Sequence, residues 1–109
     1  MSRVNVLEMS GNAYGPVQIA STNANQTLPT SIVTNDSRNA LRVVVSCEDN
    51  AIRYAFGGVI PVAGANGHVL AANEILTIGH PGSIESFRFV SAVANSHANL
   101  QITGEYGTL

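Results

Sequence analysis

The sequence predicts an all-β protein, a single-domain antiparallel β-sandwich of jelly-roll-like or immunoglobulin-like topology. Two observations indicate this fold class. Apolar and polar residues alternate over short runs, as they do in half-buried strands, and turn-forming residues separate these runs at regular intervals, as in sandwiches and barrels. No convincing long amphipathic helix is visible. A length of 109 residues suits one domain that spans residues 1–109.

The clearest strand signals lie in the middle of the chain. Residues 40–47 alternate with a predicted inward face of Leu41, Val43, Val45 and Cys47. Residues 51–56 alternate again, with Ile52, Tyr54 and Phe56 inward. The polar residues 48–50 between the two runs are typical of a turn, which predicts a β-hairpin.

Turn residues divide the remainder of the chain into further short strands. Gly57 and Gly58 end the second strand, and a loop follows at 59–67. The later expected elements are strands 68–70 and 74–78, a turn at 79–83, a strand at 84–92, a polar loop at 94–98 and a strand at 99–106.

The first third of the chain carries weaker signals. Short strands are expected around Val4, at 16–20 and at 30–34, with a turn at 35–37. Two alternatives stay open for residues 1–35: they are integral strands of the sandwich, or they include an N-terminal arm at 1–15 that adds a strand to a neighbouring sheet. The candidate interface residues are Val4, Val6, Leu7, Met9 and Tyr14.

Composition favours a protein that works inside an assembly. Charged residues make up only 11 % of the chain, against about 25 % in typical globular proteins, and lysine is absent. Neutral polar side chains cost less to desolvate than charges, so such a surface suits burial against partners. A neutral surface without functional meaning is the alternative reading.

Several partners and compartments are not expected. Five scattered arginines and a net charge of −2 argue against nucleic acid as a partner. No apolar run is long enough for a membrane-spanning helix. The N-terminus has no signal-peptide core, so synthesis and residence in a cytoplasm are expected unless an assembly carries the protein out.

No motif for catalysis or for a cofactor is present. The possible metal ligands Cys47, His68, His80 and His97 lack ligand spacing. There is no Gly-x-Ser-x-Gly elbow, and the glycine clusters at 57–58 and 64–67 lack the lysine of a phosphate loop. We therefore expect no catalytic, cofactor-binding or metal-binding residues, and a buried, structural Cys47.

The segment from Leu41 to Tyr106 resembles small virion proteins of tailed bacteriophages. The similarity rests on the order of strands and turns, carried by residues 41–45, 52–58 with Pro61, 67–76, 87–90 and 100–102. Such chains look like capsid decoration, or cement, proteins and related head or tail components.

The resemblance implies a non-enzymatic structural protein that oligomerises and clamps neighbouring capsid subunits. Its implied partners are the major capsid protein and other copies of itself, as a dimer or trimer. Its implied location is the capsid surface of a virion. The alternative is a ligand- or carbohydrate-binding module of a phage fibre or tail, against which the absence of tryptophan counts.

Overall fold

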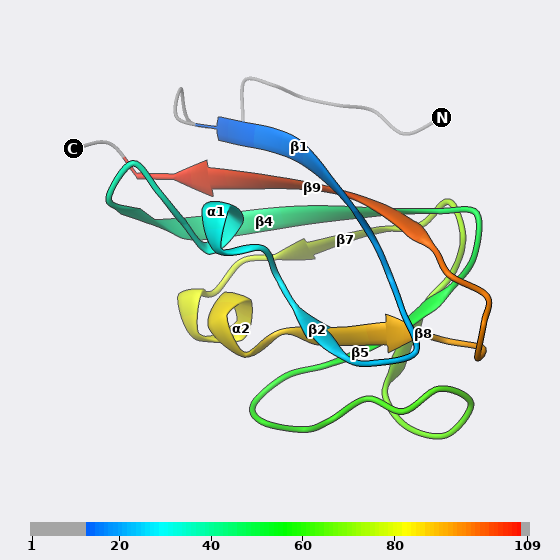
Figure 1. Cartoon of the computed structure of the whole chain (residues 1–109). Coiled ribbons are helices and arrows are strands. Elements are labelled where there is room, and N and C mark those ends of the chain that lie inside the picture. The colour runs from blue at the N-terminus through cyan, green and yellow to red at the C-terminus, as the bar shows by residue number, and fades with distance from the viewer. Residues whose placement is uncertain (1–12, 108–109) are drawn as a thin grey trace.

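The structure, a computed structural model, describes residues 13–107 and consists mainly of antiparallel strands in two sheets (Figure 1). The first sheet has the order β1-β9-β4-β3, and β7 also pairs with β4. Its strands are β1 (Ala13–Ala20), β3 (Thr34–Asn35), β4 (Arg38–Glu48), β7 (Ile75–Ile78) and β9 (Asn99–Tyr106). The predicted all-β class is confirmed.

The second sheet has the order β2-β8-β5-β6. Its strands are β2 (Gln26–Thr27), β5 (Ile52–Ala55), β6 (His68–Leu70) and β8 (Arg88–Ser91). Two short helices, α1 (Thr30–Val33) and α2 (Pro81–Ser86), lie between strands along the chain. The predicted strands at 68–70 and 99–106 agree with β6 and β9.

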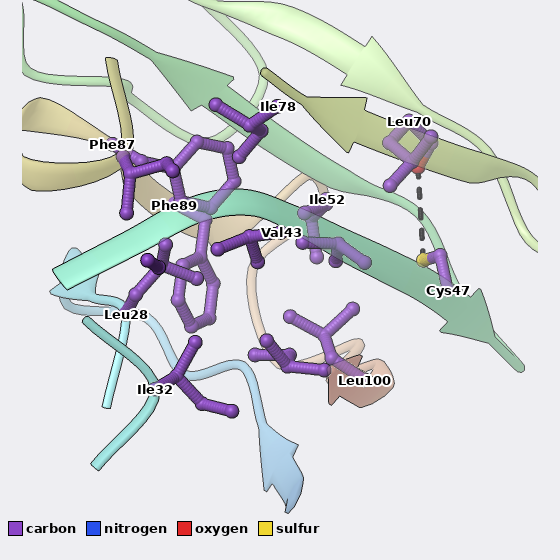
Figure 2. Close-up of a cluster of buried hydrophobic side chains, with 14 of the residues drawn as sticks. Leu28, Ile32, Val43, Cys47, Ile52, Leu70, Ile78, Phe87, Phe89 and Leu100 are labelled. Atoms are coloured by element: carbon purple, nitrogen blue, oxygen red, sulfur yellow. Dashed lines mark hydrogen bonds between the residues drawn. The ribbon is translucent and has the colours of Figure 1, made fainter. Parts of the chain in front are cut away.

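One cluster of buried side chains draws on both sheets (Figure 2). Val43 and Leu100 come from the first sheet, and Ile52 and Phe89 from the second; each is fully buried. Cys47 belongs to the same cluster, as predicted, and its thiol contacts the Leu70 carbonyl oxygen at 3.8 Å (Figure 2). The alternation of strand side chains therefore supplies one apolar face from each sheet.

The predicted inward position of Leu41 is wrong. The register between β4 and β9 shifts between Ala40 and Arg42, and such a β-bulge changes which residues face the core. Ala40 is consequently buried, whereas Leu41 is half exposed. From Val43 onward the predicted inward face is confirmed.

The predicted hairpin of residues 40–56 is also wrong, because β4 and β5 belong to different sheets. Both edges of β4 are occupied, one by β9 and the other by β3 and β7. The connection instead crosses between the sheets, and Asp49 adopts a left-handed φ of 66° there. Asp49 Oδ2 accepts a hydrogen bond from Asn99 Nδ2 at 2.8 Å, which ties the crossing to β9.

Two predicted strand segments contain helices instead. The expected strand at 30–34 is mostly α1, where the Val33 N–H bonds to the Pro29 carbonyl and the Tyr106 hydroxyl donates to the Ile32 carbonyl. The local helix bond and the tertiary bond from Tyr106 together outweigh the weak strand preference of the β-branched residues in this segment. The expected turn at 79–83 and the start of the strand at 84–92 are α2, with Pro81 in its first turn.

Candidate interaction surface

The connection between β5 and β6, residues 56–67, is the longest loop in the described part of the chain. Near its start, Gly57 and Gly58 have φ values of 67° and 87°. Glycine adopts such positive φ values readily, because it has no Cβ that would clash with the backbone. A bridge between Val62 and Asn66 then turns the chain back toward β6. The sequence predicts a loop at 59–67, and the structure confirms it; Phe56, predicted as the last residue of the preceding strand, follows the end of β5 at Ala55.

The loop packs on the second sheet, on the side that faces away from the core. Val90 alternates with the core residue Phe89 and pairs with Arg53, so it points to that side, yet it is buried. Pro61 of the loop is also fully buried. Figure 1 shows the loop, in green, beyond β5 and β8 and away from β4 and β9.

Two hydrogen bonds attach the loop to neighbouring segments, and a third lies within the loop. Arg53 Nη1 donates to the Gly67 carbonyl at 2.9 Å, and the Gly64 N–H donates to the Ala92 carbonyl at 2.8 Å. Within the loop, Asn66 Nδ2 donates to the Ile60 carbonyl at 3.3 Å. The loop is thus attached to β5 and to the connection that follows β8.

Apolar side chains remain exposed on the loop and on the two segments beside it. We call this set the loop surface. Its members have exposed fractions between 45 % and 62 %: Val59, Ile60, Val62, Val69 and Val93. Single exposed apolar residues are ordinary, but a group of them on neighbouring segments is typical of a binding surface.

A shallow hollow adjoins the loop surface. It measures about 430 Å³, is open to solvent, and is lined by Ala55, Phe56, Val59, Asn66, Gly67 and His68. Its walls are mainly apolar, and the His68 ring lies 5.4 Å from the Tyr54 ring. Such a hollow can receive an apolar side chain of a partner.

Charge is absent from this part of the sequence. No Asp, Glu, Lys or Arg occurs between residues 54 and 73, or between residues 89 and 104. Burying the loop surface would therefore desolvate few charged groups, and charges are depleted at the cores of protein interfaces. This chemistry suits a neutral, apolar protein partner.

Of the five predicted interface residues, only Tyr14 belongs to the part of the chain that the structure describes. Val4, Val6, Leu7 and Met9 lie outside the described residues. Tyr14 lies in β1, opposite Gly104 of β9, and is 42 % exposed. Burial raises the pKa of Tyr106, and the proximity of Tyr14 raises it further. Tyr14 is accessible to a partner, and its interface role stays a prediction.

The sequence does not predict the loop surface, because the glycine, proline and asparagine residues of 59–67 indicate only a connecting loop. A usable signal was present. Three large apolar residues, Val59, Ile60 and Val62, fall in a segment punctuated by glycine, proline and asparagine. Polar residues normally fill such a loop, so apolar ones there indicate either local burial or binding.

The nucleophilic and metal-ligating side chains have structural roles. His80 Nδ1 accepts from the Gly82 N–H and caps α2. His97 Nδ1 lies 2.8 Å from Ser91 Oγ, but Ser91 is fully buried and its Oγ also lies 2.7 Å from Ser21 Oγ. A substrate could not reach that hydroxyl without rearrangement. Residues 13–107 hold no group of three potential metal ligands.

Comparisons of the chain with protein-family models, curated proteins and solved structures find no match. Among residues 13–107, no helix has the length and apolarity needed to cross a bilayer.

Proposed function

We propose that the protein is a non-enzymatic structural protein that works by binding other protein subunits through the loop surface. The observation that carries this proposal is the uncharged, exposed apolar set Val59, Ile60, Val62, Val69 and Val93. Removing such surface from water favours association by roughly 25 cal/mol per Å². A lattice that repeats the contact gains avidity without further chemistry.

The resemblance of residues 41–106 to phage virion proteins supports a particular setting for this binding. The protein is a capsid decoration protein on the surface of a virion, and its partner is the major capsid protein. The low charge and the absence of lysine fit a chain whose surface is buried between subunits. The loop surface is the part that contacts the capsid.

The two sheets pack face to face as an antiparallel β-sandwich around their common core. Support comes from the core cluster, to which β4 and β9 of one sheet and β5 and β8 of the other contribute. The sandwich then serves as a rigid support from which the loop surface is presented.

Co-sedimentation with shells assembled from a tailed-phage major capsid protein tests the function. Val69→Glu places a charge on the loop surface, and we expect it to weaken binding at least tenfold. Ile75→Glu is the matched control, because Ile75 is as exposed as Val69, 51 % in each case, but lies on β7 of the other sheet. It should bind like the unmodified protein.

Two outcomes would contradict the proposal. If shells bind Val69→Glu as well as they bind the unmodified protein, the loop surface does not take part in the contact with the capsid. A protein that ignores shells but binds in a glycan screen would replace the decoration role with the carbohydrate-binding one.

A further inference from the structure

Strand β1 presents the longest free strand edge in the described part of the protein. It has eight residues and pairs only with β9 there. The other outer strands are much shorter, with two residues in β2 and β3, three in β6 and four in β7. Short edges resist pairing with other chains, whereas a long one is a template for it.

The register of β1 shows which of its backbone groups face outward. The Ser21 N–H donates to the Ala98 carbonyl at 2.8 Å, in register with the pairs Ile19–Leu100 and Val17–Ile102. Antiparallel strands alternate between residues that bond to the partner strand and residues that do not. The N–H and C=O groups of Gln18 and Ala20 therefore point away from β9.

Pro16 lies within the irregularity between Tyr14 and Val17 and has no register partner on β9. The Val17 N–H, in register with Ile102, points toward β9, and the carbonyl of a trans peptide unit points opposite to its N–H. The Pro16 carbonyl, which shares a peptide unit with the Val17 N–H, therefore faces the free edge and is available as an acceptor. The outward edge thus offers two donors, at Gln18 and Ala20, and three acceptors, at Pro16, Gln18 and Ala20.

Charged residues and β-bulges usually protect an edge strand from pairing with another chain, and the second half of β1 has neither. No residue of Ala13–Ala20 is charged. The register irregularity lies between Tyr14 and Val17, so Val17–Ala20 forms a regular edge. Val17 and Ile19 pack on the core but remain half-buried at this edge. A second strand beside them would remove more of their surface from water.

We propose that β1 pairs antiparallel with β1 of a second copy of this chain, with Gln18 opposite Gln18. In this register each Gln18 N–H donates to the Gln18 carbonyl of the other copy. Each Ala20 N–H donates to the Pro16 carbonyl of the other copy, so every outward N–H finds an acceptor. Val17 of one copy then lies beside Ile19 of the other, a favourable apolar cross-strand pair.

The occupant is a second copy because the edge is complementary to itself. A two-fold axis through Gln18 brings the same residues together from both sides, which is an isologous contact. The edge carries no charge, so no like charges meet across the axis. The contact closes at two copies. It uses the sheet opposite the loop surface and therefore goes beyond the proposed function.

Sedimentation equilibrium of the full chain over a concentration series tests this dimer. Gln18→Pro removes the central donors without removing a bond to β9, and Gln18→Lys places two like charges at the axis. We expect a dimer for the unmodified chain and at least a tenfold higher dissociation constant for each variant. Added salt should partly restore the dimer of Gln18→Lys, because it screens the repulsion.

Thr77→Lys is the matched control, since Thr77 is an exposed polar residue of the same sheet on β7. It should dimerise like the unmodified chain. Circular dichroism confirms that each variant is folded, and Gln18→Lys decides the question if Gln18→Pro unfolds.

A monomeric unmodified chain, a dimer that both Gln18 variants leave unchanged, or association beyond two copies would each overturn the proposal. If the unmodified chain is monomeric and the Gln18 variants bind shells less well than it does, the free edge of β1 pairs with a strand of another protein instead of a second copy. Shell binding is measured separately, so failure of the dimer is distinguishable from failure of the proposed function.

Discussion

Cys47 shows how burial sets the chemistry of a single side chain in this protein. Its side chain is 1 % exposed, and its thiol donates to the Asn50 carbonyl at 3.0 Å. The pKa of this thiol is raised from 9.0 to about 11, mainly by desolvation; a backbone hydrogen bond from Ile52 opposes the rise, and the nearby carboxylate of Glu74 adds to it. The thiolate that would act as a nucleophile or a metal ligand is therefore disfavoured near neutral pH.

The raised pKa of Cys47 predicts a loss of stability in alkali. Below pH 9 the thiol is protonated in the folded and unfolded states, so its contribution is fully present. Above pH 9 the unfolded chain releases the proton while the folded protein retains it, and the loss continues up to about pH 11. We expect the free energy of unfolding to fall by about 1 kcal/mol by pH 10 from this group.

Urea unfolding at pH 8 and pH 10 measures this change, with Cys47→Ala as the control. The variant should lack this part of the decline while keeping the part due to other groups. Equal declines in both proteins would show that the thiol has the same pKa folded and unfolded.

At the scale of elements, Gly67 fixes the position of the 56–67 loop. Its φ of 113° is a conformation that side chains rarely adopt. A Cβ there would lie 3.1 Å from Pro61 Cβ and 3.1 Å from the Tyr54 carbonyl oxygen. Gly64 has a φ of 70°, but a Cβ on it would meet nothing within 4 Å. Among the glycines of this loop, only Gly67 combines a positive φ with a close approach to the sheet.

The comparison of these two glycines gives a prediction about the loop. Gly64→Ala should cost about 1–2 kcal/mol, the penalty of a left-handed alanine. Gly67→Ala should cost more, because Pro61 must also move from the sheet, and it should expose the loop to proteolysis. Urea unfolding and limited proteolysis measure both effects; equal costs for the two variants would show that the loop does not depend on this contact.

At the scale of the whole molecule, the two sheets depend on one core. Phe89 of β8 is fully buried in the same cluster as Leu28, Ile32 and Leu100 (Figure 2). The Tyr106 hydroxyl also joins β9 to α1 through the Ile32 carbonyl. A protein with a shared core is expected to unfold in one cooperative transition.

Phe89→Ala tests whether the chain is a single domain. It should lower the free energy of unfolding by about 3–5 kcal/mol through lost burial and a cavity. Backbone amides of β9, in the other sheet, should lose hydrogen-exchange protection together with those of β5. Thr103→Ala is the control, since Thr103 lies on the outward side of β9 and should change little. Unchanged protection of β9 in Phe89→Ala would show two independent sheets.

The sequence by itself determined the β class, most strand positions and the buried state of Cys47. These follow from alternation and turn residues, which are local properties of the chain. In β9, for example, Leu100 and Ile102 alternate with Gln101 and Thr103, and the structure buries only the first pair. Local alternation reports which face of a strand is apolar, whatever the strand packs against.

Only the tertiary structure decided the partners of each strand and the position of the loop surface. Nothing near residues 48–50 indicates that β9, β3 and β7 occupy the edges of β4 and send β5 to the other sheet. Helix α1 accepts a hydrogen bond at the Ile32 carbonyl from Tyr106, which is distant in sequence. The exposure of Val59 and Val69 likewise depends on how the loop folds back over the sheet. These features arise from contacts between distant residues, which compete with local preferences and overrule them when the preferences are weak.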